Sequence, residues 1–294
     1  MMDPTYAIQV FLGGLLLGGI YGLLALGMSL NLGLLGLMNL AHGSVLVFGG
    51  LVGYLLVEKG GVSPFLALVL VPLFFAGLGA VSYPLLIRPL SERRPESAFV
   101  AFLLITLGLA FILEEVSATL LPHPLVGLDL GFSPWQWKGL VLSPLSLLLL
   151  SVLGGCLLLL GGFLFGTQRG WALRAIPQDP VGAVLVGISL SSARSLAWSL
   201  GLCAAALAGM FWIFLYPITS FMGLKLTVTA MLMVMVVGPG EILKAVGAGM
   251  IWGILESAGS AVLGAQWGLL LPLGLFLGWA AFSPQEKILF GGSA

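Results

Sequence analysis

Residues 4–57 read PTYAIQVFLGGLLLGGIYGLLALGMSLNLGLLGLMNLAHGSVLVFGGLVGYLLV and contain no Asp, Glu, Lys or Arg. A helix crosses a bilayer core about 30 Å thick with roughly 20 residues, so this stretch predicts two membrane passes. Its second half contains Asn39-Leu40-Ala41-His42-Gly43, which places polar side chains and a glycine deep in the apolar run. Such residues are typical of a broken helix that lines a cavity. We therefore expect Asn39, His42 and Gly43 to lie on a translocation pathway.

The composition of the whole chain indicates a membrane protein. Its 294 residues are 60% hydrophobic and 7% charged, whereas soluble domains are about 25% charged. The formal net charge is zero, which argues against nucleic acid as a partner. We predict an all-α polytopic membrane protein, with residues 1–294 forming a single transmembrane domain of about 8–10 transmembrane helices.

Apolar runs separated by polar segments predict about nine spans. The spans are residues 6–29, 32–57, 65–87, 98–121, 141–166, 195–216, 218–237, 245–263 and 267–282, the second of them broken at Asn39–Gly43. Arginines gather in the loops 88–97 and 167–194, which the positive-inside rule places in the cytoplasm. This orientation puts the N-terminus outside and the C-terminus inside.

Glycines at four-residue spacing predict close helix packing, because small residues let membrane helices approach each other. The sets are Gly14, Gly18 and Gly22, then Gly49 and Gly53, and finally Gly249 and Gly253. Residues 6–57 and 195–237 also share an order of elements, a span followed by an interrupted segment. Paired interrupted segments predict an internal two-fold repeat around a central pathway.

Charged residues within the apolar surroundings are candidate pathway residues. Glu256 lies well inside a predicted span, where an ionised group is costly unless it faces the protein interior and pairs. Lys225 has the opposite charge and is its candidate partner, although a lysine there can equally snorkel outward. The doublet Glu114-Glu115 lies near a span end, where we expect it to be solvated.

The sequence predicts neither a metal site nor a catalytic site in this chain. His42 and His123 have no second ligand nearby, and Cys156 and Cys203 lack metal-ligand spacing. The phosphate-binding pattern GxxxxGK[ST] is absent from the sequence. We therefore expect no cofactor in this chain, and ATP, if it powers transport, must bind another chain.

The loop 167–194 reads TQRGWALRAIPQDPVGAVLVGISLSSAR and is the most informative polar segment. Pro177 and Pro180 predict that one short helix ends near residue 176 and that another begins near residue 180. Short helices on the membrane face suit docking into a partner's groove.

Three stretches make the chain resemble the LivH type of permease, the membrane subunit of branched-chain amino-acid ABC importers. They are residues 13–44 with the N-x-A-H-G element, residues 169–188, and residues 236–257 with a glycine-rich turn before Glu256. The resemblance implies that the loop 167–194 is the coupling element that docks on the ATPase. The matching positions include Gly170, Arg174, Ala175, Asp179 and Gly187.

The resemblance also implies an importer of branched-chain or other small amino acids in a prokaryotic cytoplasmic (inner) membrane. Its expected partners are a second permease subunit, two cytoplasmic ATPase subunits that bind ATP, an extracytoplasmic solute-binding protein and membrane lipid. The alternative is a stand-alone ion-coupled transporter or channel for a small neutral or zwitterionic solute such as urea or an amide. In that case Lys225 and Glu256 would couple solute transport to the movement of an ion.

Overall fold

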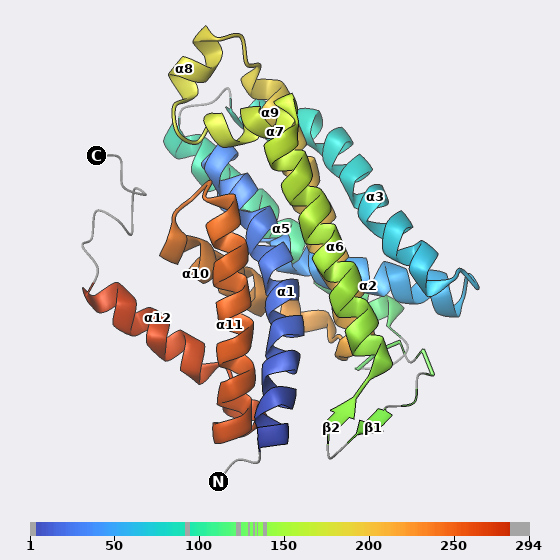
Figure 1. The fold of residues 1–294 in the computed structure, drawn as a ribbon. Helices are drawn as coiled ribbons and strands as arrows, with labels where there is room; N and C mark the ends of the chain where they lie inside the picture. Colours follow the sequence, from blue (N-terminus) through green and yellow to red (C-terminus); the bar gives the residue numbers. More distant parts are fainter. Residues whose placement is uncertain are drawn as a thin grey trace.

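The computed structural model describes residues 4–91, 95–121, 125–128, 130–131, 133, 135–137 and 140–282 (Figure 1). His123 and residues 283–294 at the C-terminus lie outside these ranges. The elements are α1 (Pro4–Leu35), α2 (His42–Glu58), α3 (Pro64–Ser82), the π-helical turn η1 (Tyr83–Ile87), α4 (Arg88–Ser91), α5 (Pro95–Leu120), β1 (Trp135–Trp137), β2 (Leu140–Leu142), α6 (Pro144–Gly166), α7 (Gln168–Ala175), α8 (Pro180–Leu185), α9 (Leu190–Leu215), the 3-10 turn η2 (Ser220–Met222), α10 (Gly223–Val237), α11 (Ile242–Leu263), the 3-10 turn η3 (Ala265–Trp267) and α12 (Leu270–Phe282).

The helices confirm an all-α polytopic membrane protein. In the described part of the chain, seven helices are long and apolar enough to cross a membrane, and two shorter apolar helices cover residues 42–58 and 265–279. The outer faces of the bundle are also apolar, as expected for contact with lipid: Leu158 on α6 is 79% exposed, for example. The β1–β2 hairpin is a small addition within the long loop before α6.

The first break lies between two helices, whereas the sequence placed it inside a span that starts at Leu32. Helix α1 continues past the predicted end at Ser29 because residues 30–35 contain no proline and are apolar except for Asn31. It ends where Gly36 adopts a φ of 67° and its N–H donates to the carbonyl of Leu32 at 3.0 Å. This left-handed conformation is one that glycine adopts without steric cost. The chain is then non-helical until α2 begins at His42.

The longest interface of the bundle joins α1 to α11 along the predicted glycines. A Cβ atom added to Gly18 would lie 2.6 Å from the Met250 carbonyl oxygen, and one added to Gly253 would overlap the backbone of Gly18. The two backbones are therefore in direct contact. A Cβ atom on Gly49 would likewise lie 2.8 Å from Cα of Ala206 on α9. The packing role predicted for these glycines is confirmed.

Helix α9 lies at the centre of the bundle, where α1, α2 and α3 all pack against it. Helix α2 runs at a steep angle to α1 (Figure 1). A second break follows α9: the chain is extended at Tyr216, and Ile218 exchanges backbone hydrogen bonds with Val126 at 2.8 and 3.2 Å. Helix α10 then begins at Gly223. Each half thus contains a span, a break and a shorter helix, and the two-fold relation between the halves stays a prediction.

Replacing Gly253 by Leu should separate α1 from α11, because the new side chain would occupy the space of the Gly18 backbone. Overpacking of this kind costs about 1–3 kcal/mol. We expect a clear fall in the apparent melting temperature of the chain in detergent. Gly247→Leu is the matched control on the same helix, since a Cβ atom at Gly247 has no neighbour within 4 Å. Equal melting temperatures for the two variants would contradict this account of the interface.

Candidate functional site

The two breaks meet inside the bundle, where the first turns of α2 and α10 touch. The Gly43 N–H donates to Oγ1 of Thr227 at 2.8 Å, and a Cβ atom on Gly43 would overlap the Gly223 carbonyl oxygen. The Thr227 hydroxyl is within donating distance of the carbonyl oxygens of Leu40 (3.0 Å) and Gly223 (3.1 Å). Gly43 is therefore required at this contact, because any side chain there would push α10 away.

Asn39 and His42 are fully buried at the same break. Oδ1 of Asn39 accepts a hydrogen bond from the Ala41 N–H at 3.0 Å. Nε2 of His42 lies 2.9 Å from the Leu24 carbonyl oxygen, which can only accept, so the imidazole carries its proton on Nε2 and ties the break to α1. Nδ2 of Asn39 and Nδ1 of His42 have no hydrogen-bond partner among the described residues. Buried polar atoms without partners are rare and mark candidate functional sites.

Glu114 on α5 contacts both helix starts, contrary to the solvated position expected from the sequence. The residue is only 8% exposed, and its Oε1 accepts hydrogen bonds from Oγ of Ser44 (3.3 Å) and from the Leu224 N–H (3.2 Å). A carboxylate near the N-termini of two helices interacts favourably with both helix dipoles. Glu115, in contrast, is exposed as expected.

The spacing of residues along α5 indicates from the sequence alone that Glu114 faces the inside of the bundle. Phe102, Thr106, Ala110 and Glu114 follow one another at four-residue intervals and form one buried stripe. Thr106 belongs to the same site, since its Oγ1 accepts a hydrogen bond from the Leu40 N–H at 3.2 Å. The periodicity of a helix face would therefore have placed the carboxylate inside the bundle.

A second polar cluster surrounds Glu256 on α11. Its carboxyl group lies near the Tyr21 hydroxyl on α1 and the Trp252 indole on α11. The Tyr21 ring packs edge-on against Trp212 with centroids 6.0 Å apart, and Trp212 lies 5.6 Å from the Tyr216 ring. Oε2 of Glu256 and the indole N–H groups of Trp212 and Trp252 have no hydrogen-bond partner within the described residues.

Lys225 does not form the predicted ion pair with Glu256. It is exposed on α10 and lies outside salt-bridge distance of this carboxylate, although its charge still acts on Glu256. Asn39, His42 and Gly43 are thus brought together, Glu256 belongs to a neighbouring cluster, and Lys225 stands apart. The two clusters are connected through α1, on which Tyr21 and Leu24 lie one turn apart.

The loop 167–194 folds into two short helices, with α7 ending at Ala175 and α8 beginning at Pro180, as the two prolines predicted. Arg174 is turned inward: its Nε–H donates to the Leu164 carbonyl oxygen at 3.1 Å, and its guanidinium lies 4.0 Å from the Phe165 ring centroid. Asp179 caps α8 by accepting a hydrogen bond from the Gly182 N–H at 2.9 Å.

The remaining predicted coupling residues also shape this loop. Gly170 is buried against the backbone of Leu164, Ala175 is partly buried, and Gly187 has a φ of 89° that ends the α8 turn. The exposed surface of the loop also contains large apolar side chains. Leu185 is 82% exposed and Val186 is 78% exposed. The sequence did not single out these two residues, because a helix as short as α8 shows no clear apolar period.

The chain is similar to membrane permeases. The family described as the permease component of branched-chain amino acid transport systems matches residues 10–280. A protein of Methanocaldococcus jannaschii named as a probable branched-chain amino acid transport permease, LivH, is 28% identical over 264 residues, covering 87% of this chain and 82% of that protein. The Pseudomonas aeruginosa high-affinity branched-chain amino acid permease BraD is 26% identical over 306 residues, covering 97% and 96%. No solved structure is significantly similar to the chain.

Replacing Glu114 by Ala should destabilise the junction between α2 and α10, because the Ser44 hydroxyl and the Leu224 N–H would lose their buried acceptor. An unsatisfied buried donor costs about 1–3 kcal/mol. We expect the apparent melting temperature in detergent to fall. Glu115→Ala, which removes the same charge from the adjacent exposed position, should leave it nearly unchanged. If the two variants melt alike, Glu114 does not hold the junction.

Proposed function

Because this chain belongs to the family of branched-chain amino acid transport system permease components, we propose that it imports branched-chain or other small amino acids as the membrane subunit of an ATP-binding-cassette transporter. The observation that carries this proposal is the meeting of two broken segments, with partnerless polar atoms, in the middle of an apolar bundle. A bundle with only a structural role would gain nothing from such atoms, since each is costly in lipid.

The chemistry along α1 suits a small zwitterion with an apolar side chain. The Glu256 carboxylate can accept from an ammonium group, and the indole N–H groups of Trp212 and Trp252 can donate to a carboxylate. The surrounding residues are mostly apolar, which favours an aliphatic side chain over a charged one. Asn39, His42, Gly43 and Glu256 are therefore our candidate pathway residues. Lys225 is retained as a more distant charge near the same path.

The solute would be delivered by an extracytoplasmic binding protein, and a second permease subunit, related to this chain but distinct from it, would complete the pathway. ATP would bind to two cytoplasmic ATPase subunits. In the expected orientation the N-terminus of this chain faces outside and its C-terminus faces the cytoplasm of a prokaryotic cell. The loop 167–194 then lies at the inner face of the membrane, where Leu185 and Val186 offer an apolar contact for an ATPase groove.

Movement of the loop 167–194 can be transmitted to the pathway through a second apolar core. Leu173 on α7 and Ala183 on α8 are buried together with Leu30 and Leu34 of α1 and with Ala197 of α9. Arg174 and Gly170 fasten α7 to the end of α6. A closing ATPase pair that displaces α7 and α8 would therefore shift the end of α1, next to the first break. The stand-alone alternative is less well supported, because Lys225 and Glu256 form no ion pair.

Replacing Leu185 by Glu should weaken association with the ATPase subunits, because the contact proposed here is apolar and the carboxylate would have to be desolvated. Loss of a central apolar contact weakens binding roughly tenfold. Leu185→Met, which stays apolar, is the control. Co-purification from the native membrane measures the effect. Equal recovery of the ATPase with both variants would exclude α8 as its docking element.

Replacing His42 by Ala should slow amino-acid uptake roughly tenfold, since the bond from Nε2 to the Leu24 carbonyl would be lost and the break would loosen. Binding of the ATPase should not change. His42→Gln, whose amide can donate to the same carbonyl, should restore part of the rate. Radiolabelled leucine uptake into proteoliposomes of the whole transporter is the measurement. Normal uptake by His42→Ala would mean that the break is only architectural.

A further inference from the structure

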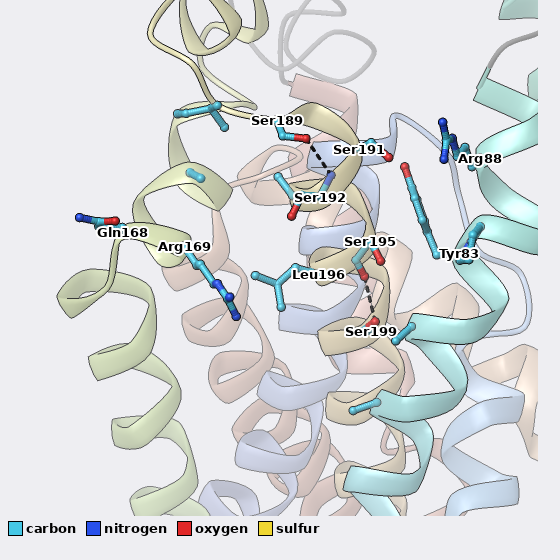
Figure 2. Close-up of a pocket in the computed structure, with 16 residues that line it drawn as sticks. Tyr83, Arg88, Gln168, Arg169, Ser189, Ser191, Ser192, Ser195, Leu196 and Ser199 are labelled. Atoms are coloured by element: carbon cyan, nitrogen blue, oxygen red, sulfur yellow. Dashed lines mark hydrogen bonds between the residues drawn. The ribbon is translucent and has the colours of Figure 1, made fainter.

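A cleft of about 810 Å³ lies apart from the proposed pathway, near the end of the bundle that carries α7 and α8 (Figure 2). Helix α9 forms its floor, α3 with η1 forms one wall, and α7 forms the other. Figure 2 shows Arg169 extending from α7 toward α9, while Arg88 lies at the opposite rim. Arg169 is thus a positive charge inside the cleft, and the described residues that line the cleft include no Asp or Glu. The cleft is therefore suited to an anion.

The floor adds hydrogen-bond donors. Ser191, Ser192 and Ser195 line the cleft, and their hydroxyl groups make no hydrogen bond to other described residues. Ser199, one turn further along α9, behaves differently, since its Oγ donates to the Ser195 carbonyl oxygen at 2.9 Å. Such back-bonding is a common arrangement for serine in a helix. Three serine hydroxyls thus stay available to a ligand in the space beside Arg169.

Part of the cleft lining is apolar, with Ala76 and Ala80 on α3 and Leu196 on α9. The neighbouring outer surface of α3 and η1 is apolar and suits contact with lipid, since Leu73 on α3 is 61% exposed and Leu85 on η1 is 68% exposed. A ligand in this cleft would therefore meet a cation and hydroxyls as well as small apolar side chains. This is the polarity profile of a phospholipid at the membrane interface.

We propose that this cleft binds the phosphate-bearing headgroup of an anionic phospholipid. Arg169 attracts the negative charge, and the hydroxyls of Ser192 and Ser195 donate to phosphate oxygens. An acyl chain lies over Ala76 and Ala80, toward the lipid-facing side of α3. A bound headgroup would connect α7 to α3 across α9. A soluble phosphate shares the headgroup chemistry but would leave the apolar part of the cleft unused.

Native mass spectrometry of the delipidated full-length chain tests the proposal. The protein is titrated in mild detergent with dioleoylphosphatidylglycerol, and in parallel with dioleoylphosphatidylcholine and inorganic phosphate. We expect phosphatidylglycerol to bind in preference to phosphatidylcholine. Arg169→Gln should lower its apparent affinity about fivefold, as expected for one basic residue near an anionic headgroup. Ser195→Leu should lower it as well, by filling the floor of the cleft.

Lys244→Gln is the matched control, because it removes one positive charge from an exposed lysine on α11 that pairs with Glu241 rather than lining the cleft. It should bind lipid like the unaltered chain, and all variants should keep the same melting temperature. Equal binding of the two lipids, or equal losses in Arg169→Gln and Lys244→Gln, would overturn the proposal. Displacement of phosphatidylglycerol by inorganic phosphate would identify the cleft as a site for a soluble anion instead.

Discussion

Backbone that leaves a helix inside a membrane must find its hydrogen-bond partners within the protein, because lipid offers none. Residues 36–41 are such a segment, and their surroundings are built to meet this requirement. Thr106 on α5 accepts from the backbone N–H of Leu40, Thr227 on α10 donates to its carbonyl, and His42 is tied to α1. The break therefore fixes the positions of α1, α2, α5 and α10 relative to one another.

The junction between α2 and α10 allows the two helices only certain movements. The contact of Gly43 with Gly223 leaves no space for a side chain, so α2 and α10 can move only together or by separating. Glu114 reaches both helix starts and would lose hydrogen bonds if they parted. The apolar core of α7, α8 and the end of α1 lies next to this junction. A displacement of the loop 167–194 would thus strain a few buried hydrogen bonds at this junction. It would not be absorbed by small adjustments of the surrounding side chains.

Much of the architecture could be predicted from particular residues. The glycines of α1 and α11 predicted a backbone contact, and Pro177 and Pro180 predicted where α7 ends and α8 begins. These signals are local, since a proline or a small residue restricts its own helix. Glu114 was misplaced because its neighbour Glu115 made the pair resemble a solvated helix end. Its real environment comes from α2 and α10, which are distant in sequence.

The sequence by itself determined that the chain is a polytopic helical membrane protein with a break at Asn39–Gly43, because hydropathy and helix-breaking residues act locally. Only the tertiary structure decided which groups satisfy that break, which residues of the loop 167–194 are exposed, and that Lys225 stays apart from Glu256. Those outcomes depend on the packing of α1, α5, α9 and α10. Long-range packing follows from the shape and hydrogen-bonding capacity of whole helix faces, which no short stretch of sequence contains.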